Sequence, residues 1–466
     1  MKLKFLVLLC SLNLSACTLF YTDYEEPTFP DVSAYLDYEK FKGQNVGADF
    51  YKAFLDDNLT LVINQALVNN YDMQKSYINV QKALLNVDLT ATNDHPSLSS
   101  SFTSKISSAL DRHDSSVKGS NGSFNLSYQL DLFGKLNAQD EASLALYKAT
   151  AYEYKAMRLS IIQTAASAYW QYAYALEAVK LGKEDLNDSK TRLNLVNQKF
   201  VAGAANSLDV DDAHINHLKV QEQLDLRIAN LQKAKTALNT ILGQTAQKEV
   251  RVSLLDETKL PKFNLDIPSK LLSRRPDLMK DAALLEQAYA KYNLAKTSFF
   301  PDFTFSAAVN GSDTNTFVNF LNNPIGSLGA AITLPFLNFN ELSIKKDIAK
   351  KDIEYYNLSF VSDYINAVAE VYDGVSDYTF YQKSYATTKK TYKLSVQNYA
   401  RYRQRYEAGL VDLSDFLNSA DTMRNAKIAY LEAKLNRLKS TMALMSAIGG
   451  DNDDSLENLD KSPFRH

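Results

Sequence analysis

The stretch YEAGLVDLSDF at residues 406–416 has an earlier counterpart in the chain, FVAGAANSLDV at residues 200–210. Both carry an aromatic residue, then Ala-Gly, then an aspartate six positions after the glycine. The two glycines, Gly203 and Gly409, lie 206 positions apart. Because self-similarity at a fixed offset marks repeat architectures, this pattern indicates an internal duplication.

Other landmarks repeat in the same order, with the offset drifting only between 204 and 206. They are 70–72 with 275–277, 95–98 with 300–303, 130–132 with 334–336, and 242–243 with 448–449. The chain is therefore a tandem duplication. We expect a targeting segment at 1–16, a further N-terminal segment at 17–54, repeat 1 at 55–250, a linker at 251–267, repeat 2 at 268–450 and a C-terminal tail at 451–466.

Each repeat is predicted to contain three helical stretches. Proline is absent between Pro96 and Pro261 and again between Pro335 and Pro463, which permits long helices. The expected ranges are 55–92, 137–202 and 207–242 in repeat 1, and 268–298, 340–408 and 413–448 in repeat 2. Charged residues throughout exclude a membrane span, so coiled packing in water is predicted. The opening and returning helices are expected to stack end to end beside the long one, over aromatic clusters at 169–174 and 372–381.

Two alternating segments follow each opening helix, at about 97–108 and 122–132, and at about 302–311 and 326–336. Strict alternation of apolar and polar residues predicts strands with two different environments. Their length of about ten residues suits a tilted membrane strand. Four strands are too few to close a barrel, and open edges cannot lie in lipid, so transmembrane strands would require oligomerisation. A soluble sandwich alternates in the same way, but four strands supply too little core for one.

The N-terminus reads as a targeting segment, with Lys2 and Lys4 before an apolar run too short to span a bilayer. It ends in Leu-Ser-Ala-Cys at 14–17, which resembles a bacterial lipobox. That resemblance implies cleavage before Cys17 and lipidation of Cys17; an ordinary signal peptide containing a cysteine is the other interpretation. Thr18 follows Cys17, so no aspartate stands there to suggest retention at the inner membrane. By resemblance, 1–16 is a lipoprotein signal peptide, 17–54 is an N-terminal periplasmic segment, and the protein is expected at the outer membrane.

Several function classes are excluded by composition. With 51 basic and 54 acidic residues, the chain lacks the excess of positive charge that is typical of nucleic-acid-binding proteins. No glycine-rich phosphate loop or catalytic constellation is present, so the chain is not expected to be an enzyme. His214 and His217 are spaced to share a metal, but a solvated helix face is favoured because HExxH and nearby cysteines are missing. No cofactor is expected apart from the covalent lipid on Cys17.

The lipobox, the two repeated phrases and four further motifs together resemble the outer membrane factor family, the TolC-like export ducts, in its NodT-type lipoprotein branch. Those motifs are SYQLDLFGK (127–135), LLSRRPDL (271–278), FFPDF (299–303) and ITLPF (332–336). The resemblance implies a mixed α/β membrane protein with the tandem-duplicated TolC-like fold. In a homotrimer, four strands per protomer would form one twelve-stranded outer-membrane barrel above a periplasmic coiled-coil tunnel.

The same resemblance implies partners and a function. The partners are a periplasmic adaptor (membrane fusion) protein, an inner-membrane transporter of the RND type, and outer-membrane lipid. The protein would be the exit duct of a tripartite efflux or type I secretion-like system, passively conducting substrates from the pump to the exterior. The alternative is a structural coiled-coil outer-membrane lipoprotein that does not conduct.

By resemblance, the repeated phrases are hairpin tips at the periplasmic entrance. Threefold symmetry would gather acids into carboxylate rings at the aperture, and charged rings set selectivity in pores. The aperture residues are Asp209, Asp212, Asp415 and the tyrosine Tyr406. Helix capping explains Asp209 and Asp415 equally well, since acids are favoured in the first turn of a helix.

Small residues surround both tip glycines and match the family's adaptor-docking motif: Ala202, Gly203, Ala204, Ala408, Gly409 and Leu410. A plain tight turn would need the same glycines. Some family members close the mouth with an arginine shortly after the second glycine. That position is Val411 here, and Arg403 and Arg405 are the candidates to replace the arginine.

Overall fold

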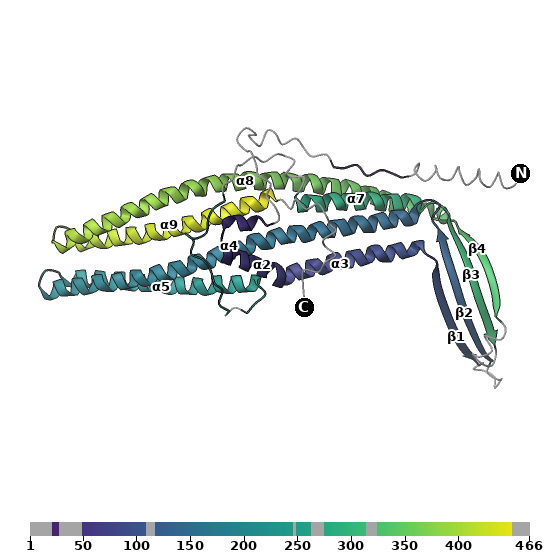
Figure 1. The fold of residues 1–466 in the computed structure, drawn as a ribbon, viewed down its shortest axis with the longest axis horizontal. Helices are drawn as coiled ribbons and strands as arrows, with labels where there is room; N and C mark the ends of the chain where they lie inside the picture. Colours follow the sequence, from purple (N-terminus) through teal and green to yellow (C-terminus); the bar gives the residue numbers. More distant parts are fainter. Residues whose placement is uncertain are drawn as a thin grey trace. The chain divides into compact units, whose positions relative to one another are not determined.

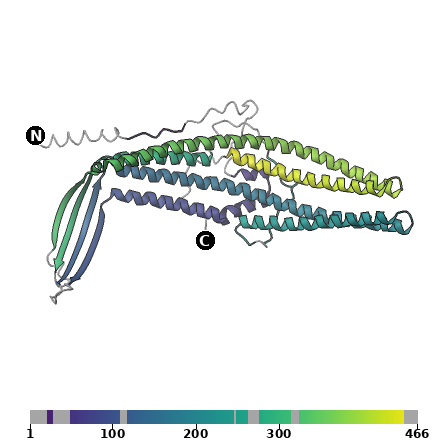
Figure 2. The same cartoon turned by 180° about the vertical axis from the view of Figure 1, so that it is seen from behind.

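The computed structural model describes residues 21–27, 49–108, 117–245, 248–261, 275–313 and 324–449, shown from opposite sides in Figures 1 and 2. These residues belong to two compact units. Unit 1 combines Met1–Phe29, Ile78–Tyr152 and Met279–Ser362; unit 2 combines Pro30–Tyr77, Glu153–Leu278 and Asp363–His466. Cys17, the expected signal peptide at 1–16 and the expected tail at 451–466 lie outside the described residues. Each unit therefore draws on both halves of the duplication.

Unit 1 contains a four-stranded antiparallel sheet in the order β1-β2-β3-β4. The strands are β1 (Ser97–Ser107), β2 (Val117–Leu130), β3 (Asp302–Asp313) and β4 (Ile325–Thr333). Strand β2 begins five residues before its expected start at 122. Strand β4 ends three residues before its expected end at 336, because Pro335 cannot donate to a ladder and instead opens the short 3-10 helix η5 (Pro335–Asn338). The hairpin of each repeat joins the other through β2 and β3.

Four helices contribute residues to unit 1: α3 (Tyr71–Ala91), α4 (Lys135–Val201), α7 (Pro276–Thr297) and α8 (Phe339–Glu407). Helix α7 contacts α4 through the ion pair of Lys148 Nζ with Glu286 Oε1 at 2.8 Å. The segment 21–27 is bound to both helices in this unit. Tyr21 donates its hydroxyl to Gly134 O at 2.9 Å at the start of α4, and the Thr22 amide donates to Asn293 Oδ1 at 2.9 Å on α7.

Unit 2 contains the returning helices α5 (Ser207–Ile241) and α9 (Leu413–Ile448), with η2 (Phe50–Phe54) and α2 (Asp57–Asn69). The prediction of one opening helix over 55–92 is wrong, because the helix is interrupted at Asn70, between α2 and α3. Asn70 has extended backbone, and its Oδ1 accepts from the amides of Asp72 and Met73 at 2.9 and 3.2 Å. An N-cap of this kind starts a new helix at Tyr71.

In unit 2, the end of each returning helix makes a hydrogen bond with the start of an opening helix, and this contact occurs once in each repeat. Asn70 Nδ2 donates to Ile241 O at 3.0 Å, and Arg275 Nη1 donates to Ala447 O at 2.9 Å. The donors are 205 positions apart and the acceptors 206, so these are the same contact made once in each repeat. In both cases, a side chain at the start of an opening helix holds a free carbonyl at the end of a returning helix. Within unit 2, each returning helix therefore ends against the first residues of α3 or α7.

A buried core lies at this level of unit 2. Trp170 and Tyr169 are fully buried, and Trp170 packs on Phe54 with ring centroids 5.0 Å apart. The buried carboxylate of Asp56 accepts hydrogen bonds from Tyr169, from the amide of Leu59 and from hydroxyls at 253 and 258. Such complete pairing is what a buried charge requires. The corresponding expectation for 372–381 is wrong in part, because Tyr372 and Phe380 are exposed.

No helix within the described ranges is both long enough and apolar enough to cross a membrane.

Candidate functional site

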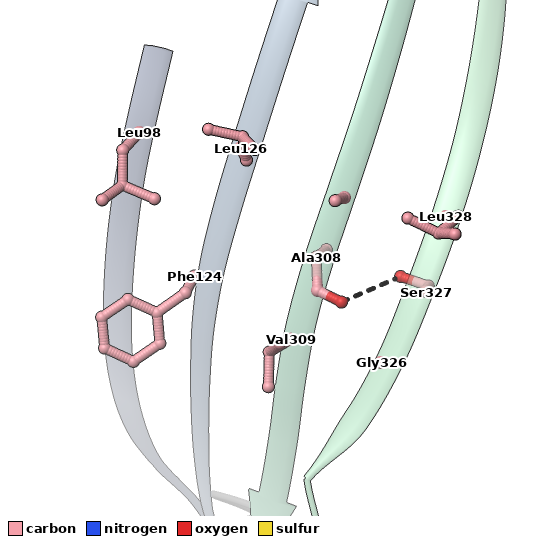
Figure 3. A pocket seen from close by; sticks show the side chains of 9 residues that line it. Leu98, Phe124, Leu126, Ala308, Val309, Gly326, Ser327 and Leu328 are labelled. Atoms are coloured by element: carbon pink, nitrogen blue, oxygen red, sulfur yellow. Dashed lines mark hydrogen bonds between the residues drawn. The ribbon is translucent and has the colours of Figure 1, made fainter. Parts of the chain in front are cut away.

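The sheet of unit 1 has one apolar and one polar face. The strand register brings Leu98, Leu126, Ala307 and Leu328 into one row across the sheet, as Figure 3 shows for the three leucines. This row borders an open hollow of about 650 Å³. The row beside it, on the opposite face, is Ser99, Asn125, Ala308 and Ser327. Alternation therefore holds across all four strands at once, as required of a wall between lipid and water.

The apolar face is uncovered in the described part of the chain. Leu328 is 90% exposed and Leu98 is 73% exposed, and every residue of β1 and β4 is exposed. Soluble proteins rarely expose a continuous apolar surface of this kind. The face therefore needs an apolar environment.

The two hairpin tips of unit 2 end their long helices with the same motif. Gly203 and Gly409 have φ of 74° and 71°, in the left-handed region. In the first tip the Ala204 amide donates to Lys199 O and the Gly203 amide to Phe200 O; in the second, residues 410 and 409 donate to 405 and 406. This hydrogen-bond pair is the Schellman motif, which uses glycine because a Cβ strains the left-handed conformation. The repeated phrase thus folds the same way twice.

The acids beside the two tips differ in their partners. Asp209 completes a capping box, since its Oδ2 accepts from the Asn206 amide at 2.8 Å while its own amide donates to Asn206 Oδ1 at 3.0 Å. Asp415 and Asp212 are exposed and receive no hydrogen bond or ion pair from a described residue. Asp209 therefore has a structural role of its own, while the carboxylates of Asp212 and Asp415 are available to solvent.

Tyr406 lies at the centre of a buried cluster that joins the two hairpins. Its ring, 5% exposed, stacks on Phe416 at 5.1 Å, and Tyr399 stacks on the same phenylalanine at 5.8 Å. From the first hairpin, Val196 and Ala213 belong to the same cluster. Burial raises the pKa of Tyr406, and the charge of Asp209 raises it further. The tyrosine is therefore neutral and packed at physiological pH.

A lysine that the sequence did not single out bridges the hairpins at Tyr406. Lys199 Nζ lies 3.7 Å from the centre of the Tyr406 ring and donates to Tyr406 O at 2.8 Å. This combines a cation–π contact with a charge-assisted hydrogen bond. Arg403, a candidate for this role, instead pairs with Glu407 on its own helix at 3.0 Å. Val411 packs against the buried cluster. The cation at the tip therefore comes from the other hairpin.

The small residues at the tips are exposed to solvent. Ala202, Ala204, Ala408 and Leu410 are exposed, and a Cβ built on either tip glycine would meet no atom within 4 Å. The glycines are therefore required by backbone conformation and not by crowding inside the chain.

The two histidines of α5 have different surroundings. His217 Nδ1 lies 2.8 Å from Ser189 Oγ, and His214 is exposed. Among the described residues, no group of three or more His, Cys, Asp or Glu side chains is placed to hold a metal ion.

Comparison with known proteins gives the family. The sequence profile of the family "Outer membrane efflux protein" matches residues 62–244 and 267–450, once in each repeat. "Toxin and drug export protein A" of Aggregatibacter actinomycetemcomitans is 28% identical over 421 residues, covering 89% of this chain and 92% of the relative. "Probable outer membrane lipoprotein SilC" of Salmonella typhimurium is 23% identical, covering 96% and 99%.

The fold is shared with solved structures. The Campylobacter jejuni CmeC outer membrane channel superposes with a TM-score of 0.81 at 22% identity, over 92% of this chain and 94% of the other. The resemblance stated from the sequence, the TolC-like fold class and the outer-membrane location are confirmed. Since the matched residues make up most of the sequence, this chain belongs to the outer membrane efflux protein family and is an efflux channel, not an enzyme.

Proposed function

We propose that three copies of this chain form a passive exit duct, with twelve strands closing one outer-membrane barrel. The observation that carries the proposal is the open sheet. Strands β1 and β4 each have a single neighbour among the described strands, so one edge of each is unpaired. Unpaired edges are not tolerated in lipid, and closure onto the next copy removes them. An isolated structural lipoprotein would have no use for such a sheet.

The helices of unit 1 support the same closure. Helices α3 and α8, which adjoin the outer strands β1 and β4 in the chain, carry large apolar side chains that are exposed: Ile78, Leu85 and Leu89 on α3, and Ile344, Ile348, Tyr355 and Leu358 on α8. Their spacings of three, four and seven are those of a coiled-coil seam. We assign α8 of one copy to pack against α3 of the next.

Disulfide crosslinking tests the closure. Ser101→Cys on β1 is combined in turn with cysteine at Ser327, Gly329 and Ala331 on the same face of β4. In the oxidising periplasm, one combination is expected to give covalent dimers and trimers on a denaturing gel, because adjacent strands bring Cα atoms within bonding range.

The control uses the register inside one chain. Ser101 is paired with Ser123 of β2 in the same chain. The double variant Ser101→Cys/Ser123→Cys should therefore form a disulfide within one chain and run as a monomer on the gel. For the β1–β4 combinations, crosslinked bands that stop at the dimer or continue beyond the trimer would contradict the threefold assembly.

The hairpin tips of unit 2 are proposed to form the periplasmic entrance. Around the threefold axis, Asp415, Asp209 and Asp212 would form rings of negative charge beside Tyr406. The open backbone around Gly203 and Gly409, with Ala202, Ala204, Ala408 and Leu410, is proposed to receive the hairpin of a periplasmic adaptor protein. That adaptor would connect the duct to an RND-type transporter in the inner membrane. Cys17 is proposed to carry the lipid anchor.

The acidic rings lead to a conductance prediction. In planar bilayers the wild-type trimer is expected to conduct weakly and to prefer cations, because charged constrictions concentrate counter-ions. Asp415→Asn should lower the cation preference without loosening the tip, since this carboxylate has no structural partner. Asp209→Asn should have a smaller effect on selectivity and should weaken the capping box.

Ser414→Asn, one residue away and also exposed, is the matched control. If Asp415→Asn and Ser414→Asn give the same reversal potential, the ring at Asp415 does not set selectivity, while the duct itself is unaffected.

A further inference from the structure

Two arginines are buried where the first hairpin packs against the second. Arg192 on α4 is 5% exposed and Arg424 on α9 is 7% exposed. A guanidinium carries five N–H donors, and burying it is costly unless those donors find partners. Both residues belong to unit 2, and neither takes part in the tip contacts.

Two flanking contacts place the arginines at nearly the same level. Toward the tip, Val196 of α4 and Leu417 of α9 belong to one buried cluster. Away from the tip, Lys427 Nζ of α9 donates to Glu184 Oε2 of α4 at 3.2 Å. Since the two helices run in opposite directions, these contacts leave Arg192 and Arg424 about one helical turn apart along the axis, at 1.5 Å per residue. Two arginine side chains span that distance easily.

The donors of the two arginines are incompletely used. Arg192 Nε, Arg192 Nη2 and Arg424 Nη1 are buried and have no hydrogen-bond partner among the described residues. The Nε–Nη2 edge is the planar fork that binds two oxygens of a carboxylate or phosphate at once. Three unused donor nitrogens on two adjacent cations form an arrangement that suits an oxyanion.

The two neighbouring aspartates do not bond to the three unused donor nitrogens. Asp185 accepts from Arg227 Nη1 at 3.3 Å. Asp421 pairs with Arg424 and accepts from Asn216 Nδ2 at 3.4 Å. Among the described residues, neither aspartate forms an ion pair with Arg192. Burial lowers the pKa of Arg424 to about 10, and repulsion from Arg192 lowers it further, so the guanidinium is still a cation at neutral pH.

We propose that Arg192 and Arg424 bind one small oxyanion between the hairpins, with the Nε–Nη2 fork of Arg192 as its main ligand and Arg424 Nη1 as the third donor. The chemical class is that of phosphate, sulfate or a small carboxylate. The donor nitrogens are closed off from solvent within a single chain, so the ligand is taken to be a free ion and not a side chain of a second copy. The ion would fasten α4 to α9 above the tip. This site lies within one chain and does not depend on the proposed assembly.

The test is calorimetric titration of the full-length protein in detergent with sodium sulfate, against sodium chloride at equal ionic strength. Saturable binding of one sulfate per chain is expected. Arg192→Met should weaken it about tenfold or more, since it removes two charge-assisted hydrogen bonds. Arg192→Met also removes an unpaired buried charge, so the variant should still fold and assemble.

Two further variants sharpen the result. Arg192→Lys keeps the charge but lacks the fork, and it should resemble Arg192→Met more than the wild type. Arg403→Met removes an exposed, paired arginine and should bind sulfate as the wild type does. The proposal is overturned if the wild type shows no saturable sulfate binding, which would also be the result if a carboxylate of a second copy filled the site. It is equally overturned if Arg192→Met and the wild type bind with the same affinity.

Discussion

Leu328→Lys is expected to prevent stable insertion of the sheet into the outer membrane, while Ser327→Lys, one residue earlier, is expected to be tolerated. Leu328 is the fourth of the nine residues of β4 and is 90% exposed on the apolar face. A lysine facing lipid near the middle of a barrel strand costs about 2–4 kcal/mol, and three copies would together lose roughly 6–12 kcal/mol. That is comparable to the whole stability of a typical domain, about 5–15 kcal/mol.

Ser327 lies on the polar face, where a lysine would meet water in the bore. The measurement is the fraction of protein in the outer membrane that resists extraction by urea, with Leu328→Met as a second control for size. Equal membrane fractions for Leu328→Lys and Ser327→Lys would show that the two faces of the sheet do not meet different environments.

Arg275→Met is expected to lower the unfolding temperature by several degrees. Arg275 donates to Asp277 from Nε at 3.1 Å and from Nη2 at 2.8 Å, to Glu370 at 2.7 Å, and to Ala447 O at 2.9 Å. It thereby holds the start of α7 to α8 and to the end of α9 in unit 2. Hydrogen bonds to charged groups contribute about 1.5–3 kcal/mol each, and the partial exposure of both carboxylates reduces this to a total loss of about 2–4 kcal/mol.

The stability lost in Arg275→Met should depend on pH. Burial opposes ionisation of Asp277, but the hydrogen bond and charge of Arg275 outweigh it and lower the pKa of the carboxyl. A depressed pKa gives stability that is present above the unfolded value, near 3.9, and lost as pH falls through the folded value. The difference in unfolding temperature between the wild type and Arg275→Met should therefore narrow below about pH 4.

Scanning fluorimetry from pH 7 to pH 3 measures this difference. The matched control is Lys345→Met, which breaks an exposed i,i+4 pair with Glu341 and should leave the unfolding temperature nearly unchanged, because exposed ion pairs contribute little to stability. A constant difference across the pH range would assign the effect of Arg275 to its contact with Ala447 O alone.

The repeats, the four strands and the long helices could be read from the sequence because they depend on local periodicity and composition. The break at Asn70 could not, since a side chain that caps α3 and binds Ile241 O looks like any polar residue in a helical stretch. The acids at the tips were found from their spacing, and the capping role of Asp209 was foreseen because capping follows local rules.

The bridging cations were missed for the opposite reason. Lys199 lies 207 positions from Tyr406, and Arg192 is likewise remote from Arg424, so no short-range pattern links them. Only the packing of one hairpin on the other brings these residues together. Val411 stands where some family members have an arginine, and nothing in the sequence pointed to Lys199 as a cation beside Tyr406.

The duplication makes the contact of Lys199 with Tyr406 one half of a pair of quasi-equivalent contacts. The positions equivalent to Lys199 and Tyr406 are Arg405 and Phe200, again 206 residues apart. Both are exposed in the single chain, Phe200 at 47%. In a ring where the hairpins follow one another by approximate sixfold symmetry, the next step would place Arg405 over Phe200 of the neighbouring copy. The mouth would then be held by two alternating classes of cation–aromatic contact, lysine on tyrosine within copies and arginine on phenylalanine between them.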